Sequence, residues 1–356
     1  GSATLELGFR GRVRRDLRGL YRAGSDDEAW LASQLCPTDA RRFFPCLDEP
    51  GMKARYRIRV TAPADQAVLS NAPIEFEEPL GDGRKTVHFE STPRLSSYLI
   101  AVAVGPFEAS AIRISGTTAI RVHSLPGRQD LTAFACEAAA ESLERLERWF
   151  DMPHPYPKLD LVALPAFAFG AMENAGAVFF RDSILLLDDS QANVEDRKRT
   201  SEVIAHELSH MWFGNLVTMC WWNDLWLNEA FATWMAYEII DSWRPEWQIW
   251  LDFGHRREHA LEMDALASSH PIAPPIRSAE EAHENFDAIT YTKGASVLCM
   301  LEHYLGRDVF RDGIQLYIRR HREANAEAAD LWAALSEVSG EPIEAIVSPA
   351  SCVARP

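Results

Sequence analysis

The chain has 356 residues, of which 47% are hydrophobic and 25% are charged. This length is typical of two or three domains, and this composition is that of a globular protein able to bury large cores. No apolar run approaches the roughly 18–20 residues of a membrane-spanning helix, so we expect no membrane segment. The formal net charge of −16 argues against nucleic acid as a partner, because phosphate binding requires basic surfaces.

The acidic residues are spread along the chain rather than gathered in a tail. A solvated anionic surface explains this distribution, and an acidic cleft that attracts a cationic group such as a peptide amine is a second interpretation. The six cysteines show no close pairing, which indicates reduced thiols rather than a disulfide framework. No signal peptide is recognisable, and we therefore expect a cytoplasmic protein.

Residues 1–108 have the pattern of a β domain. Alternating apolar and polar residues predict strands at Thr4–Phe9, Tyr56–Val60 and Thr86–Phe89, with turn-forming Pro, Gly and Asp residues between them. The sequence therefore predicts antiparallel sheets for this part of the chain.

Beyond residue 108 the pattern becomes mixed and then helical. A helix is predicted from about Leu131 to Phe150, and from Val194 onward the chain is almost entirely helical in pattern. Strands are predicted at Ala119–His123, Leu159–Leu164, Ala177–Phe180 and Ile184–Leu187. Together with the β domain, this order of elements predicts an α+β multidomain protein.

A possible metal site lies in the first of the later helices. The apolar segment around residues 203–213 contains His-Glu-x-x-His, whose spacing places His206 and His210 on one helical face, one turn apart. Eighteen residues separate His210 from Glu229, which also lies in a helical pattern. Two imidazoles and one carboxylate leave a fourth position open, as catalytic zinc sites do. We predict one zinc ion per chain on His206, His210 and Glu229, with Glu207 as general base.

The alternative for the two histidines is a pair of core side chains with satisfied hydrogen bonds, because the motif alone also arises by chance. The carboxylate of Glu229 on a second helix favours the metal site. Four other parts of the chain agree with this choice: Gly170–Asn174, Thr290–Ala295, Trp221–Trp226 and the stretch Pro37–Pro50.

With these segments, the sequence resembles the M1 family of zinc aminopeptidases, aminopeptidase N-like gluzincins, over nearly its whole length. Gly170–Asn174 matches the exopeptidase motif of the family, and Thr290–Ala295 matches the segment that carries a catalytic tyrosine. The resemblance implies a partial N-terminal β-sandwich or saddle domain over residues 1–108. It implies a thermolysin-like, mixed α/β but mainly helical zinc peptidase domain over residues 109–346, and residues 347–356 form an atypical tail.

The same resemblance implies hydrolysis of the N-terminal bond of peptides that have a free N-terminus. Tyr291 would donate a hydrogen bond to the oxyanion, and Glu173 would bind the substrate α-ammonium group. The backbone of Gly170–Met172 would align with the extended substrate like an added strand. The residues predicted to bind substrate are Gln34, Gly170, Ala171, Met172, Glu173 and Asn174.

Each of these roles has a structural alternative. Glu173 would otherwise cap a turn, and Tyr291 would be a core aromatic residue with a satisfied hydroxyl. Asp224 either orients a zinc ligand or caps a helix, and the sequence leaves both interpretations open. Phe167 and Phe169, beside Met172, predict an apolar or broad preference for the first substrate side chain.

The chain also departs from the family pattern. The family usually has an acidic residue or glutamine two positions after Gln34, where it helps to bind the substrate amine, and this chain has Cys36. Loss of one charge-assisted hydrogen bond costs about 1.5–3 kcal/mol, so we expect weaker amine binding and a raised Michaelis constant. About half of the N-terminal domain and the helical C-terminal domain of the family have no counterpart here. We therefore expect a chain truncated at both ends, with an unpaired sheet edge.

Two other functions remain open. A thermolysin-like endopeptidase shares the histidine motif and a downstream glutamate, although Gly170–Asn174 argues against it. A truncated, inactive homologue acting as a scaffold is the second alternative. Inactive relatives typically lose a ligand or the base, whereas the three ligands, Glu207 and Tyr291 are all present. The oligomeric state is not indicated by the sequence.

Overall fold

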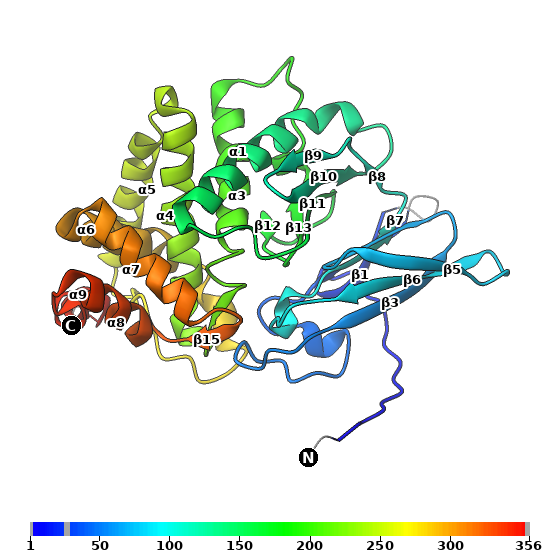
Figure 1. The fold of residues 1–356 in the computed structure, drawn as a ribbon, viewed down its shortest axis with the longest axis horizontal. Coiled ribbons are helices and arrows are strands. Elements are labelled where there is room, and N and C mark those ends of the chain that lie inside the picture. Colours follow the sequence, from blue (N-terminus) through cyan, green and yellow to red (C-terminus); the bar gives the residue numbers. More distant parts are fainter. Residues whose placement is uncertain (1–2, 25–28, 353–356) are drawn as a thin grey trace.

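The computed structural model describes residues 3–24 and 29–352, the last five of them by their backbone only. Figure 1 shows a β-rich part, formed by the first hundred residues, beside a larger part in which helices flank a mixed sheet. This arrangement confirms the predicted α+β class. The predicted domain boundaries at residues 108 and 346 remain predictions, and residues 353–356 of the predicted tail lie outside the described residues.

The β-rich part contains two antiparallel sheets. The four-stranded sheet has the order β1 (Gly19–Ala23), β2 (Trp30–Gln34), β7 (Val102–Gly105), β4 (Ala67–Ser70). The three-stranded sheet has the order β3 (Arg57–Pro63), β6 (Arg84–Ser91), β5 (Ile74–Pro79). Val68 and Val104 of the first sheet share an apolar cluster with Val87 and Phe89 of the second. The predicted strands around residues 56–60 and 86–89 are confirmed.

The strand predicted at Thr4–Phe9 is wrong. No described strand pairs with these residues, and the side chains of Leu5, Leu7 and Phe9 are 80%, 57% and 58% exposed. Alternation of apolar residues specifies a strand only where a neighbouring strand pairs with the backbone and a second layer covers the apolar face. β5 is also exposed, since all six of its residues face solvent at an edge of the three-stranded sheet.

The second part begins with a mixed sheet. Its central strands β10 (Thr118–Ser124), β11 (Lys158–Leu164) and β13 (Ala177–Arg181) are parallel. The short strands β8 (Glu108–Ala109), β9 (Arg113–Ser115) and β12 (Ala171–Met172) are antiparallel to their neighbours. Helix α1 (Ala133–Phe150) connects β10 to β11, as a parallel pair requires. Three of the strands predicted here, and the helix between the first and the second of them, are confirmed.

The strand predicted at Ile184–Leu187 is wrong, because its first half lies in the one-turn helix α2 (Asp182–Leu185) and its second half is in no strand. Ile184 and Leu185 are buried, as the apolar run implies. A run of only four apolar residues fits either a buried strand or a buried helical turn, and periodicity does not distinguish the two.

The helices that follow surround α4 (Leu225–Trp243), whose residues 225–240 are all buried. The others are α3 (Val194–Ser209), α5 (Ile249–Asp264), α6 (Gly294–Leu305), α7 (Arg307–Arg320), α8 (Ala328–Ser339) and α9 (Ile343–Cys352). A small parallel pair, β14 (Val217–Met219) and β15 (Ala324–Ala326), interrupts the helical pattern. Within the described part of the chain, no helix has both the length and the apolar character needed to cross a bilayer.

Candidate active site

Helix α3 carries the two histidines at its C-terminal end. A capping box fixes its start, because Asn193 accepts a hydrogen bond from the backbone of Asp196 and the Asp196 carboxylate accepts one from the backbone of Asn193. The helix ends at Ser209, and His210 follows with helical dihedral angles. His206 and His210 therefore stay one turn apart on the same face, with their Nε2 atoms 3.0 Å apart.

Helix α4 packs against α3 and brings Glu229 to the same point. Its Oε2 atom lies 3.3 Å from Nε2 of His206 and 3.4 Å from Nε2 of His210. In a tetrahedral zinc site with bonds of about 2.05 Å, neighbouring ligand atoms are about 3.3 Å apart. The three distances, 3.0, 3.3 and 3.4 Å, match this spacing, so the donor set fits zinc.

The other nitrogen of each imidazole has a partner that fixes its orientation. Nδ1 of His210 lies 3.0 Å from the Phe213 carbonyl oxygen, which can only accept. The hydroxyl of Thr233 donates to the Glu229 carbonyl at 2.7 Å, so it accepts from Nδ1 of His206 at 3.4 Å. Both Nδ1 atoms then carry the proton, and both Nε2 lone pairs point at the common site. Thr233 was not predicted, although its place one turn after Glu229 on the same helix is a usable signal.

The position of Gly214, beside His210, favours a glycine because of its backbone angle and the close approach of neighbouring side chains. Its backbone has a φ of +115°, and a Cβ atom there would lie 3.1 Å from Nδ1 of His210 and 3.2 Å from Nδ2 of Asn228. An alanine at this position would combine backbone strain with pressure on the imidazole.

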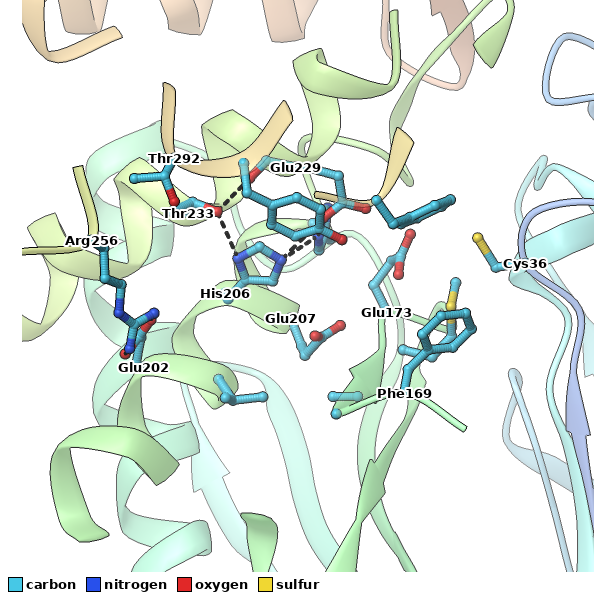
Figure 2. A pocket seen from close by; sticks show the side chains of 17 residues that line it. Cys36, Phe169, Glu173, Glu202, His206, Glu207, Glu229, Thr233, Arg256 and Thr292 are labelled. Atoms are coloured by element: carbon cyan, nitrogen blue, oxygen red, sulfur yellow. Dashed lines mark hydrogen bonds and ion pairs between the residues drawn. The ribbon is translucent and has the colours of Figure 1, made fainter. Parts of the chain in front are cut away.

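Glu207 lies in the same helix as the histidines, and its carboxylate faces the cavity (Figure 2). It is buried, its Oε2 atom has no hydrogen-bond partner among the described residues, and burial raises the pKa of its carboxyl well above the usual value. Glu173 contributes another carboxylate within 4.8 Å of Glu207 and His210. Three buried carboxylates beside two imidazoles create a strong demand for positive charge, which a divalent metal would partly meet.

Tyr291 lies in one turn of π-helix, residues 289–293, immediately before α6. Two backbone N–H groups at the start of this turn donate to Oδ1 of Asp287, at 3.0 and 3.1 Å. The phenol ring lies parallel to the His206 ring, with centroids 5.9 Å apart. Burial raises the pKa of Tyr291 well above its usual value, so the hydroxyl keeps its proton and can act as a donor. A π-helical turn is frequent at functional sites.

Glu173 directly follows the short strand β12, whose residues Ala171 and Met172 pair with Phe180 and Phe179 of β13. Its side chain is buried, and burial raises the pKa of its carboxyl to about 7. No described arginine or lysine pairs with this carboxylate. The Glu173 carbonyl accepts a 2.7 Å hydrogen bond from the amide of Asn215, which fixes the backbone behind the site.

A cavity of about 290 Å³ joins these groups. The predicted residues that line it are Gly170, Ala171, Met172, Glu173, His206, Glu207, His210, Glu229 and Tyr291. Gln34 and Asn174 are buried and are not among the residues that line the cavity, so their substrate-binding role remains a prediction. Gln34 contacts the wall from behind, with Nε2 3.9 Å from Sδ of Met172.

The apolar part of the wall differs from the expected one. Phe169 and Met172 line the cavity, whereas Phe167 is buried against Phe179 in the core. Phe286 takes part instead, with its ring 6.2 Å from that of Phe169. It lies more than a hundred residues along the chain from the motif, in a loop without periodicity, so no sequence signal identified it.

Cys36 and Asp224, the two residues whose roles the sequence left open, lie in different places. Cys36 lines the cavity on the side of Glu173 (Figure 2), and burial raises the pKa of its thiol well above the usual value, so it is uncharged. Asp224 is buried just before α4, and its Oδ2 lies 3.4 Å from the backbone nitrogen of Ala328. This contact links Asp224 to the start of α8 rather than to a zinc-binding residue.

The sequence was compared with known families and proteins. The model of the peptidase family M1 domain matches residues 134–349, and that of the peptidase M1 N-terminal domain matches residues 1–99. The chain belongs to peptidase family M1. This result confirms the resemblance drawn from the motifs.

Curated members of the M1 family match almost all of this chain. It is 43% identical over 352 residues to Aminopeptidase M1 of Arabidopsis thaliana, covering 98% of this chain and 40% of that protein. It is 42% identical over 352 residues to Leucyl aminopeptidase of Saccharolobus solfataricus, covering 98% of this chain and 44% of that protein. The M1 chain described here therefore spans about two fifths of the length of the curated relatives it matches.

Proposed function

We propose that this chain is a zinc-dependent aminopeptidase that hydrolyses the N-terminal bond of peptides and holds one zinc ion. The observation that carries the proposal is the carboxylate of Glu173, which is buried within 4.8 Å of Glu207 and His210 and pairs with no described arginine or lysine. A buried, uncompensated carboxylate is costly, and the α-ammonium group of a peptide would supply the missing charge. A peptide with a blocked N-terminus would lack that charge, which accounts for exopeptidase behaviour.

The donor set supports zinc, because His206, His210 and Glu229 offer two nitrogen atoms and one oxygen atom at tetrahedral spacing. When bound, zinc would supply Lewis-acid polarisation of a carbonyl group and would acidify a water molecule. The unpartnered Oε2 atom of Glu207 is the acceptor for the proton of the attacking water, and it would return the proton to the leaving nitrogen.

Tyr291 serves as the donor to the oxyanion that forms on the carbonyl oxygen when water adds to the carbonyl carbon. Its hydroxyl stays protonated, and its ring lies parallel to the His206 ring in the wall of the cavity. A donor aimed at the position of developing charge stabilises the transition state more than the ground state. The name of each relative described above contains the word aminopeptidase, which supports the same assignment.

The wall beside Glu173 favours apolar or varied side chains at the first substrate position. Phe169, Phe286 and Met172 line the cavity, and no described arginine or lysine pairs with Glu173 to attract an acidic substrate side chain. A marked preference for N-terminal Asp or Glu in a panel of substrates would contradict this part of the proposal.

The test is an assay of the purified chain with its zinc content measured. Fluorogenic amides of leucine, alanine, arginine and glutamate are compared with their N-acetylated forms, with and without a chelator. We expect cleavage of the free substrates only, lost on chelation. Cleavage of the acetylated forms would indicate an endopeptidase instead. One equivalent of bound zinc without any cleavage would favour the non-catalytic scaffold.

A further inference from the structure

The cavity has a second charged end, opposite Glu173. Arg256 of α5 and Glu202 of α3 both line it. In Figure 2 this pair lies on one side of His206, whereas Glu173 and Cys36 lie on the other side. The zinc-binding atoms and Glu207 therefore lie between two recognition elements of different charge.

The guanidinium group of Arg256 is fixed by hydrogen bonds to Glu202, and part of the Arg256 side chain remains exposed to solvent. Its two terminal nitrogens donate to the two carboxylate oxygens of Glu202, and the bond to Oε2 is 2.6 Å long. The hydroxyl of Tyr237 donates to the same carboxylate at 3.3 Å, and the guanidinium carbon lies 5.9 Å from the Tyr237 ring centre. The Glu202 side chain is 13% exposed, but that of Arg256 is 53% exposed. Two of five N–H groups are used, so others remain available to a ligand.

The charges around the cavity single out Arg256. Among the described residues that line it, Arg256 is the only arginine or lysine, whereas four glutamates share the wall. The nearby carboxylate of Asp252 is itself paired with Lys198 at 2.9 Å. Apart from the zinc ion that the three donors would hold, Arg256 is the permanent positive charge that an anionic group would meet among the described residues lining this cavity.

The direction of a bound peptide follows from the proposed function, on which this inference rests. With the α-amine at Glu173 and the scissile carbonyl at the donor atoms, the residue after the cleaved bond extends away from Glu173, toward Arg256. We propose that Arg256 determines specificity on this side by binding a carboxylate of the leaving residue. That carboxylate is either an acidic side chain or, in a dipeptide, the C-terminal carboxylate. Arg256 suits this ligand because a guanidinium group with free N–H donors forms charge-assisted hydrogen bonds with carboxylates.

Two substrate pairs test this inference and separate the two sources. One pair is leucyl-aspartate amide and leucyl-asparagine amide, which differ only in a side-chain carboxylate. The other is leucyl-alanine and its C-terminal amide, which differ only in the terminal carboxylate. Each enzyme is described by the ratio of kcat/KM within a pair, so differences in folded fraction or zinc content cancel. Arg256→Gln removes the charge, Arg256→Lys retains it, and Arg257→Gln is the matched control on the exposed face of the same helix.

In the unmodified chain we expect the carboxylate substrate of at least one pair to be preferred by about three- to tenfold, as for one partly exposed charged hydrogen bond. The preference should disappear in Arg256→Gln, persist in part in Arg256→Lys and stay unchanged in Arg257→Gln. The substrate pair whose ratio changes in Arg256→Gln identifies whether Arg256 binds the side-chain carboxylate or the C-terminal carboxylate. Equal ratios in the unmodified chain and Arg256→Gln, for both pairs, would overturn the inference and leave the proposed aminopeptidase activity standing. Cleavage of none of the four substrates would overturn both this inference and the proposed aminopeptidase activity.

Discussion

The proposed zinc ligands and the wall of the cavity are built in different ways. His206, His210 and Glu229 lie on two adjacent, packed helices, and backbone or hydroxyl partners fix both imidazoles. The wall comes from distant segments, with Cys36 after β2, Glu173 after β12, and Arg256 on α5. The geometry of the proposed ligands therefore depends on two adjacent helices, whereas the shape of the cavity wall depends on how separate segments pack.

This difference leads to a general expectation. Changes at the ligand helices should affect zinc binding or every substrate alike, because all reactions use the same atoms. Changes in the wall should alter the ranking of substrates while leaving zinc bound. Substitutions in each region therefore test whether the two regions have these separate effects.

The largest effect is expected for Glu207→Gln on the ligand helix. An amide cannot accept the proton of water, so kcat should fall by about 10²- to 10⁴-fold for every substrate. Zinc content should stay at one equivalent, because Glu207 is not one of the three donors. Metal analysis and steady-state rates on the same sample check this, and substantial residual turnover with a single substrate would contradict it.

Gly214→Ala is expected to act on zinc binding. The new Cβ would press on Nδ1 of His210, and the φ of +115° is strained for alanine, so zinc affinity should fall by about 10- to 100-fold. Gly127→Ala is the matched control, because Gly127 has a φ of +77° and a Cβ atom there would meet nothing within 4 Å. Titration with a competing chelator measures both variants. Equal affinities in the two would show that His210 is not displaced.

Cys36→Glu should strengthen binding of the substrate amine. A carboxylate beside Glu173 would add one charge-assisted hydrogen bond, and we expect KM to fall by about tenfold for free N-terminal substrates. Cys36→Gln has nearly the same shape without the charge and should give a smaller change. Steady-state kinetics on a leucine amide checks the pair. An unchanged KM in Cys36→Glu would show that residue 36 does not contribute to binding of the substrate amine.

Phe286→Ala should have the smallest effect, confined to side-chain preference. Removing one aromatic ring from the wall should lower the ratio of leucine to alanine substrates by about three- to tenfold, in line with the loss of a few methylene contacts. Phe76→Ala is the control, since Phe76 is half-exposed on β5 in the β-rich part. An equal change in both variants would contradict a specific role for Phe286.

The same division explains what the sequence could predict. His206 and His210 are four positions apart in an apolar helix, so their shared face follows from helix geometry alone. Phe286 and Arg256 join the site only through tertiary packing, which no local pattern encodes. Thr233 lies between these cases, because its spacing from Glu229 is helical but its partner is on another helix.

The two wrong strands have related causes. Thr4–Phe9 has strand alternation, but no described strand pairs with it, and alternation alone does not supply a partner. The segment at Ile184–Leu187 is too short for its apolar run to distinguish a strand from a helical turn. By contrast, the long pattern before Phe150 predicted α1 correctly, because it repeats over several turns.

Recognition of the free substrate amine by Glu173 is what would make this site an aminopeptidase. The most direct measurement compares kcat/KM for leucine amide and N-acetyl-leucine amide substrates in the unmodified chain and in Glu173→Gln, with zinc content measured. We expect cleavage of the free substrate alone. Its kcat/KM should fall by about tenfold or more in Glu173→Gln, because a charge-assisted hydrogen bond is lost, and zinc should remain bound. Cleavage of the acetylated substrate at a comparable rate, or an unchanged rate in Glu173→Gln, would contradict it.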